Sequence, residues 1–123
     1  MRLPKIGFTV YEMLQRSAQK NPAAAAVITP EATVSYGDLQ ARVDRLSNWF
    51  LEHGAAKGER VLLWGLNSSQ MVEVFFACSK VGLIAVPVNT RLSTEEARYI
   101  LHDVQPRFVF SDQPLGEAWA NDE

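Results

Sequence analysis

The sequence predicts an α/β fold in which parallel strands alternate with single helices. Three short apolar segments, residues 60–66, 83–88 and 107–111, have the length of strands, and a segment with helical periodicity separates each from the next. Strands joined in this way are typical of right-handed βαβ crossovers and a parallel sheet. The chain has 123 residues, of which 47% are hydrophobic, so it can form the core of one compact domain.

The first elements predicted are a helix and a short β-hairpin. Thr9 and Glu12 have the spacing of a capping box, and Asn21–Pro22 ends the helical pattern. The apolar side of this helix is expected to consist of Val10, Met13, Leu14 and Ala18. Residues 24–29 and 33–35, which flank a turn, are then predicted to be the two arms of the hairpin.

A longer helix is predicted to follow the hairpin. Ser35 and Asp38 suit its N-terminal cap, and the pair His53–Gly54 suits its C-terminus. Its expected apolar positions are Leu39, Val43, Leu46 and Phe50. The strand at residues 60–66 comes next.

The segment from Asn67 to Glu96 combines two helix starts with a buried strand. Asn67 and Gln70 suit the start of a helix that ends at Gly82. Its expected apolar face consists of Met71, Val74, Phe75, Cys78 and Val81. Residues 83–88 are apolar without alternation, as in a strand covered on both faces. Ser93 and Glu96 then form a capping box for a helix whose apolar positions are Ala97, Ile100, Leu101 and Val104.

The run Gly82…Pro87-Val88-Asn89-Thr90-Arg91-Leu92-Ser93…Glu96 resembles the N-terminal part of the adenylate-forming superfamily, which includes acyl-CoA synthetases, luciferases and peptide synthetases. The resemblance begins near Phe8-Thr9 and reaches Phe108-Val109-Phe110. It passes through Val34-Ser35-Tyr36-Gly37-Asp38-Leu39, which is similar to the family's Thr-Tyr-x-Glu-Leu segment. The Val-Asn-Thr-Arg loop resembles acyl-CoA synthetases more than peptide-synthetase adenylation domains, which tend to place Asp-Pro after the strand.

This resemblance implies a fragment of a fatty-acid-CoA ligase. Such an enzyme activates a carboxylic acid with ATP through an acyl-adenylate and transfers the acyl group to CoA, so ATP, Mg and CoA are implied for the full-length parent. The family's phosphate-binding loop ending in Pro-Lys-Gly and its C-terminal lysine do not occur in the sequence. We therefore expect a scaffold without catalytic residues or cofactors of its own. The alternative is a stand-alone, non-catalytic interaction module with the same fold.

The expected organisation follows from the same resemblance. Residues 1–111 are expected to form an N-terminal subdomain, and residues 112–123 a polar tail or a truncated linker. The expected partners are the remainder of the parent enzyme and, through the truncated surface, further copies of the chain. The N-terminus has no long apolar stretch of the secretory type, and we expect a cytoplasmic protein.

Composition and motifs exclude several other functions. The formal net charge of −2 gives no electrostatic case for binding nucleic acid. Residues 71–88 are interrupted by Glu73, Lys80 and Pro87, so no transmembrane segment is predicted. The single cysteine, Cys78, is expected to be buried. No metal site is predicted, because neither histidine has further ligands at metal-binding spacing.

Two rival α/β classes lack their defining residues. A dinucleotide-binding fold needs Gly-x-Gly-x-x-Gly after its first strand, whereas Trp64-Gly65-Leu66-Asn67-Ser68-Ser69 contains one glycine. A phosphoacceptor receiver domain needs acidic residues at strand ends, where only Asp112 qualifies. Both rivals are therefore disfavoured.

Asn89 and Arg91 are the candidate binding residues. They follow a predicted parallel strand, and open α/β sheets bind ligands at the carboxyl ends of their strands. In CoA-forming members of the family that the chain resembles, an arginine of this loop can approach the CoA phosphates, a role that suits guanidinium. The alternative is purely structural, with Asn89 bonding the turn and Arg91 solvated or paired with Glu95.

Overall fold

The computed structural model describes residues 10–66, 68–88 and 91–111, which form four helices and five strands. In chain order these are α1 (Val10–Lys20), β1 (Ala25–Ile28), β2 (Thr33–Ser35), α2 (Tyr36–Glu52), β3 (Arg60–Trp64), α3 (Ser68–Val81), β4 (Ile84–Val88), α4 (Thr94–Val104) and β5 (Phe108–Ser111). The predicted order of elements is therefore confirmed, with boundaries that differ by one or two residues at several strands. None of the helices described is long and apolar enough to cross a membrane.

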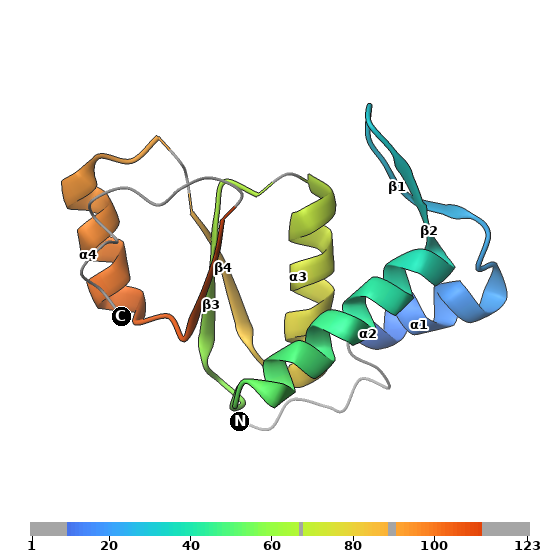
Figure 1. The fold of residues 1–123 in the computed structure, drawn as a ribbon, viewed down its shortest axis with the longest axis horizontal. Coiled ribbons are helices and arrows are strands. Elements are labelled where there is room, and N and C mark those ends of the chain that lie inside the picture. The colour runs from blue at the N-terminus through green and yellow to red at the C-terminus, as the bar shows by residue number, and fades with distance from the viewer. Residues whose placement is uncertain (1–9, 67, 89–90, 112–123) are drawn as a thin grey trace, which may run out of the picture.

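A parallel sheet of three strands forms the centre of the described structure. Its order is β4-β3-β5, and both outer strands run parallel to β3. Helices α2 and α3 cover one face, whereas α4 covers the other (Figure 1). The predicted α/β class, with a parallel sheet flanked by helices, is confirmed.

The central strand β3 is buried on both sides. Val61 and Leu63 belong to the main core, together with residues of α2 and α3, while Leu62 joins a second core with Ala97 and Leu101 of α4. All of these β3 side chains are at most 2% exposed. Alternating side chains of a strand point to opposite faces, so a strand between two helical layers needs an uninterrupted apolar run. Each such buried side chain contributes about 1.5–3 kcal/mol.

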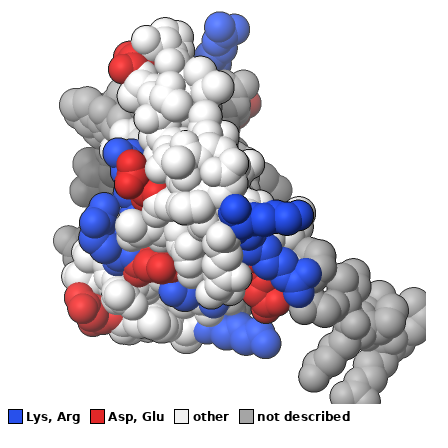
Figure 2. Space-filling model, turned by 90° about the vertical axis from the view of Figure 1, so that its right-hand side faces the viewer, with Lys and Arg blue, Asp and Glu red and all other residues white. Residues whose placement is uncertain are grey.

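The predicted hairpin is also present. Strands β1 and β2 pair antiparallel as a separate two-stranded sheet, with a bulge between Ala25 and Val27. The hairpin projects away from the parallel sheet at the end of the molecule formed by α1 and the start of α2 (Figure 1). On this side of the molecule basic and acidic side chains lie interspersed, without a patch of one sign (Figure 2).

The structure corrects two of the predicted helix faces. In α1 the core residues are Tyr11, Leu14 and Ala18, whereas Val10 and Met13 are 55% and 54% exposed. The buried stripe is rotated because the Tyr11 ring, rather than Met13, fills the junction with α2 and α3.

In α3 the buried residues include Val74, Ala77 and Cys78, while Phe75 is 39% exposed. Phe75 was expected on the buried face and Ala77 was not. A small side chain such as that of Ala77 lets a helix approach its neighbours closely, and hydrophobicity alone does not reveal this. The remaining predicted faces, those of α2 and α4, supply core residues as expected.

Local capping explains where most of the helices begin and end. Ser35 accepts a hydrogen bond from the Asp38 amide at 3.1 Å, as predicted for α2. Gly82 follows α3 with φ of 87°, a left-handed conformation that favours glycine. The predicted caps at Thr9 and Asn67 lie outside the described residues.

Candidate functional site

The carboxyl edge of the parallel sheet is the candidate site. Strand β3 connects through α3 to β4 on one side, and β4 then connects through α4 to β5 on the other side of β3. The chain thus reverses its direction across the sheet, and α3 and α4 lie on opposite faces (Figure 1). In open α/β sheets, ligands bind at the carboxyl ends of the strands where this reversal occurs. Here that point lies between β3 and β5.

Strand register places specific residues at this switch point. Trp64 at the end of β3 is level with Ser111 of β5 on one side and with Val88 of β4 on the other. The next residue, Gly65, has φ of 71°, so the chain leaves β3 through a left-handed turn that favours glycine. In the sequence, Gly65 was considered only as the single glycine of an incomplete dinucleotide-binding motif. A single glycine between a buried strand and a helix could have identified this turn.

The β4–α4 loop lies on the other side of β3 from the switch point. Arg91 is exposed in a turn before α4, and Asn89 lies outside the described residues. Arg91 follows the carboxyl end of β4, the strand on the other side of β3 from the switch point.

The start of α4 is fixed by the predicted capping box. The Ser93 hydroxyl accepts a hydrogen bond from the Glu96 amide at 3.1 Å, and the Ser93 amide donates to Glu96 Oε1 at 3.3 Å. These two amides are therefore already bonded, and Glu95 and Glu96 bring negative charge to the first turn. This helix start is poorly suited to bind an anion. An anion at this loop would have to be bound by Arg91 itself, through the charged hydrogen bonds that guanidinium makes.

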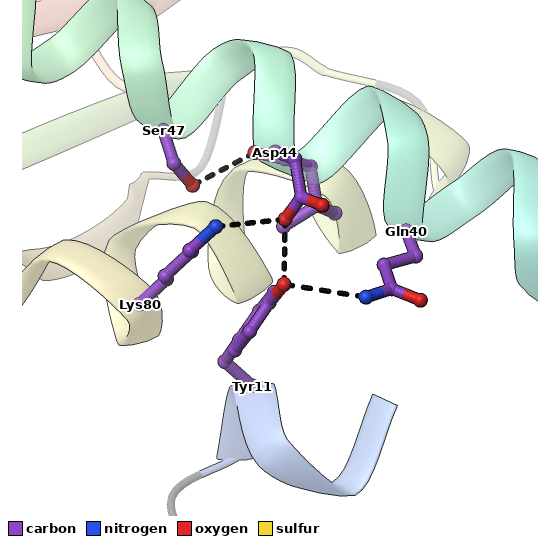
Figure 3. Close-up of polar contacts among 6 residues, drawn as sticks. Tyr11, Gln40, Asp44, Ser47 and Lys80 are labelled. Atoms are coloured by element: carbon purple, nitrogen blue, oxygen red, sulfur yellow. Dashed lines mark hydrogen bonds and ion pairs between the residues drawn. The ribbon is translucent and has the colours of Figure 1, made fainter. Parts of the chain in front are cut away.

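A cluster of interacting polar side chains lies elsewhere, where α1, α2 and α3 meet (Figure 3). The Tyr11 hydroxyl donates to Asp44 Oδ1 at 2.6 Å, and Lys80 Nζ donates to the same oxygen at 2.9 Å. Lys80 also lies over the Tyr11 ring, with its Nζ 4.7 Å from the ring centroid, and Gln40 donates to the Tyr11 hydroxyl at 3.5 Å. The cluster joins side chains from all three helices, with Tyr11 from α1, Gln40 and Asp44 from α2, and Lys80 from α3.

The charges in this cluster stabilise one another. Partial burial by itself raises the pKa of Asp44, but hydrogen bonds from Tyr11 and Lys80 and the charge of Lys80 outweigh it, so that pKa is lowered. The hydrogen bond to Asp44 raises the pKa of Lys80. Lys80 lies in the last turn of α3, near the amino end of β4. The cluster is therefore at the edge opposite the carboxyl ends of the strands, where open α/β sheets bind ligands. We assign it a structural role.

The other candidate reactive groups are also accounted for by packing. Cys78 is 2% exposed, as predicted, and its burial raises the pKa of the thiol to about 12. The His53 ring stacks on Trp49 with centroids 4.1 Å apart, and its Nδ1 lies 2.8 Å from the Trp49 carbonyl oxygen. Within the described ranges, no three His, Cys, Asp or Glu residues are grouped to hold a metal ion.

Comparison with known proteins gives consistent matches. The family model described as AMP-binding enzyme matches residues 14–122. The chain is 36% identical over 87 residues to the 3-hydroxybenzoate–CoA ligase of Aromatoleum sp. (strain CIB), covering 71% of this chain and 17% of that protein. It is 32% identical over 108 residues to the fatty acid–[acyl-carrier-protein] ligase ScoC of Streptomyces coeruleorubidus, covering 88% of this chain and 21% of that protein.

The fold also matches solved structures. The inhibitor-bound N-terminal domain of FACL13 from Mycobacterium tuberculosis superposes with a TM-score of 0.77 and 32% identity, covering 82% of this chain and 26% of that chain. This chain spans about a fifth of the length of the curated relatives named above. The similarity therefore extends over most of this chain but only a small part of each relative.

Proposed function

Because the chain belongs to the AMP-binding enzyme family, we propose that it is the N-terminal subdomain of an acid-CoA ligase. In this proposal residues 1–111 form the subdomain, and residues 112–123 lead into the rest of the enzyme. The observation that carries the proposal is the family match over residues 14–122 in a chain that spans about a fifth of its relatives. The structural similarity to an N-terminal domain supports it.

The reaction we propose belongs to the full-length parent. The parent would activate a carboxylic acid with ATP, forming an acyl-adenylate with pyrophosphate as the leaving group from ATP, and would then transfer the acyl group to the CoA thiol with AMP as the leaving group. The two relatives are both acid ligases, one for an aromatic acid and CoA and one for a fatty acid and a carrier protein. We propose a fatty acid as the substrate and CoA as the acceptor, on the resemblance of the β4–α4 loop to acyl-CoA synthetases.

The subdomain itself is proposed to act as a scaffold. Its cluster of interacting polar side chains lies away from the carboxyl edge of the sheet, and its cysteine is a buried thiol with a pKa near 12. The residues described also contain no group that fits a magnesium ion. We therefore propose no catalytic or metal-binding role for the residues that the structure describes. The cytoplasmic location expected from the sequence remains a prediction.

The experiment that tests this function compares two proteins. The isolated chain should show no saturable binding of ATP and magnesium in titration calorimetry. The product of the complete reading frame should catalyse acid-dependent exchange of pyrophosphate into ATP. Tight ATP binding by the isolated chain would contradict the scaffold role, and a reading frame without an active enzyme would favour the stand-alone interaction module.

Arg91 is the proposed contact for the CoA phosphates, and Asn89 is proposed to support the same loop. In the full-length parent, Arg91→Ala should raise the KM for CoA and leave the adenylation half-reaction unchanged, because that step uses no CoA. Arg98→Ala is a matched control, since Arg98 is an exposed arginine on α4. Equal losses in both half-reactions would assign Arg91 a structural role, and unchanged CoA kinetics would exclude the contact.

We also propose that the isolated chain self-associates through the surface that the rest of the enzyme would cover. Exposed strand edges are common sites of such association. Light scattering over a range of concentrations tests this, and a strictly monomeric chain would contradict it.

A further inference from the structure

Arg60 joins the central strand of the sheet to the end of α4. Its backbone lies at the start of β3, level with Ile84 of β4, whereas its guanidinium reaches the C-terminus of the helix. We propose that Arg60 is a positioning residue, which fixes the end of α4 and thereby the β4–α4 loop that carries Arg91. This proposal rests on the proposed function, because Arg60 would affect CoA binding only through that loop.

The guanidinium of Arg60 contacts three backbone carbonyls. Its Nε donates to the Val104 carbonyl at 2.9 Å, and its Nη2 donates to the Gln105 carbonyl at 3.4 Å. Its Nη1 donates to the Gly58 carbonyl, also at 3.4 Å. The last carbonyls of a helix lack partners within the helix, and a planar guanidinium with several N–H groups can satisfy more than one of them. Arg60 therefore connects the end of α4 with the loop before β3.

Gln105, which Arg60 contacts at this helix end, has a strained backbone. Its φ is 48°, and among the described residues it is the one residue other than glycine with a positive φ. Pro106 follows it, and the residue before a proline favours an extended backbone. Such a conformation persists only where the surroundings enforce it. Here the Gln105 amide donates to the Leu101 carbonyl at 2.9 Å and its own carbonyl accepts from Arg60, so Arg60 supplies one of the enforcing contacts.

Helix α4 is otherwise held by a small core. Among the described helices it alone covers its face of the sheet (Figure 1). Ala97 and Leu101 are buried and pack with Leu62 of β3, while its other apolar contacts involve partly buried residues. Helices α1, α2 and α3 share a larger core on the opposite face. Apolar contacts are not directional, so the hydrogen bonds from Arg60 are well suited to fix where α4 ends along the sheet.

A helix of this length transmits the position of one end to the other. Helix α4 has 11 residues and is about 16 Å long, so it begins at the carboxyl edge of the sheet and ends beside Arg60 at the amino edge. At its start, Ser93 and Glu96 each bond the amide of the other and fix the path of the chain that enters the helix. Arg91 precedes this cap in the sequence. Loss of the Arg60 contacts should therefore loosen both the cap and the loop.

Amide hydrogen exchange of the isolated chain tests the anchoring of α4. Arg60→Gln should speed exchange along α4, from the Glu96 amide to the last turn, by about tenfold, and should leave the α2 amides unchanged. Arg107→Gln is the matched control, because Arg107 Nη2 donates to the His53 carbonyl at the end of α2 at 3.1 Å. This control should speed exchange near the end of α2 and leave α4 unchanged. An effect of Arg60→Gln confined to the last turn of α4 would overturn the positioning role.

Two further variants separate hydrogen-bond geometry from charge and from strain. Arg60→Lys keeps a positive charge near the end of α4 but lacks the planar guanidinium, so its α4 amides should exchange nearly as fast as those of Arg60→Gln. Gln105→Gly removes the backbone strain, because glycine adopts a positive φ readily. Combined with Arg60→Gln, it should restore part of the lost protection. Full protection in Arg60→Lys, or no recovery with Gln105→Gly, would overturn the proposal.

Kinetics of the full-length parent test the step from α4 to the loop. Arg60→Gln should raise the KM for CoA severalfold and leave the adenylation half-reaction unchanged, whereas Arg107→Gln should change neither. If Arg91→Ala raises this KM and Arg60→Gln does not, the positioning role is overturned. If neither variant changes it, the proposed contact of Arg91 with CoA fails, whereas the anchoring of α4 by Arg60 is upheld by the exchange rates.

Discussion

Tyr11→Phe tests the polar cluster that joins the first three helices. The substitution keeps the buried ring, which is 7% exposed, and removes only the hydroxyl that donates to Asp44 at 2.6 Å. A hydrogen bond to a charged group contributes about 1.5–3 kcal/mol. The Asp44 side chain is 37% exposed, so water can replace part of this bond and the expected loss falls to about 1 kcal/mol.

The loss of unfolding free energy caused by Tyr11→Phe should also depend on pH. The pKa of Asp44 is lowered below its ordinary value of 3.8 in the folded state. A carboxyl with a lowered pKa stabilises the fold above the pKa it has when unfolded, and this contribution disappears as pH falls through the folded pKa. The difference between Tyr11→Phe and the unaltered chain should therefore be largest near pH 7 and shrink below about pH 4.

Urea unfolding at pH 7 and pH 3 provides the measurement, at a protein concentration low enough to avoid association. In thermal unfolding a loss of 1 kcal/mol corresponds to about 4 °C for a domain of this size. Tyr36→Phe is the matched control, because Tyr36 packs against the same core and no hydrogen bond of its hydroxyl is among the contacts described. A loss independent of pH, or an equal loss in Tyr36→Phe, would refute the role of Asp44.

Three further predictions concern the helix cap, the buried thiol and the outer edge of β4. Ser93→Ala should lower the free energy of unfolding by about 1 kcal/mol, because it removes the acceptor for the Glu96 amide; a neutral result in urea unfolding would contradict the capping role. Cys78 should react with a thiol reagent only as fast as the chain unfolds, because the thiol is buried and its pKa is about 12; rapid labelling of the native chain would contradict this. Pro87→Val should increase self-association in sedimentation experiments: the Ile84 amide donates to the Glu59 carbonyl on the β3 side, so Pro87 faces away from β3 and valine would restore an outward N–H group to the outer strand β4; unchanged association would contradict the idea that proline blocks this edge.

Local chemistry explains why so much of the element order could be predicted. The α4 capping box needs only Ser93 and Glu96, which are three residues apart, and it forms as expected. The uninterrupted apolar sequence of β3 requires only that other elements cover both faces of the strand, and it does not depend on which elements these are. Such signals depend on residues close together in the sequence, so the local structures that they predict are also found in the folded chain.

Burial along α1 and α3 could not be predicted in the same way. Met13 is as hydrophobic as a core residue, yet it is exposed, while Tyr11 fills the junction because Asp44 accepts from its hydroxyl and Lys80 lies over its ring. In α3, Ala77 is buried and Phe75 is 39% exposed. Which side of a helix faces the core depends on residues tens of positions away, and no local pattern contains that information.

The sequence by itself determined the fold class, the sites of the α2 and α4 caps and the resemblance that identified the family. The tertiary structure alone decided the strand order β4-β3-β5. That order places the switch point between β3 and β5, whereas Arg91 follows β4 on the other side of β3. The physical reason is that the local sequence of β4 or β5 would allow pairing on either side of β3. The side that each strand takes is decided by the helices that pack on the two faces of the sheet.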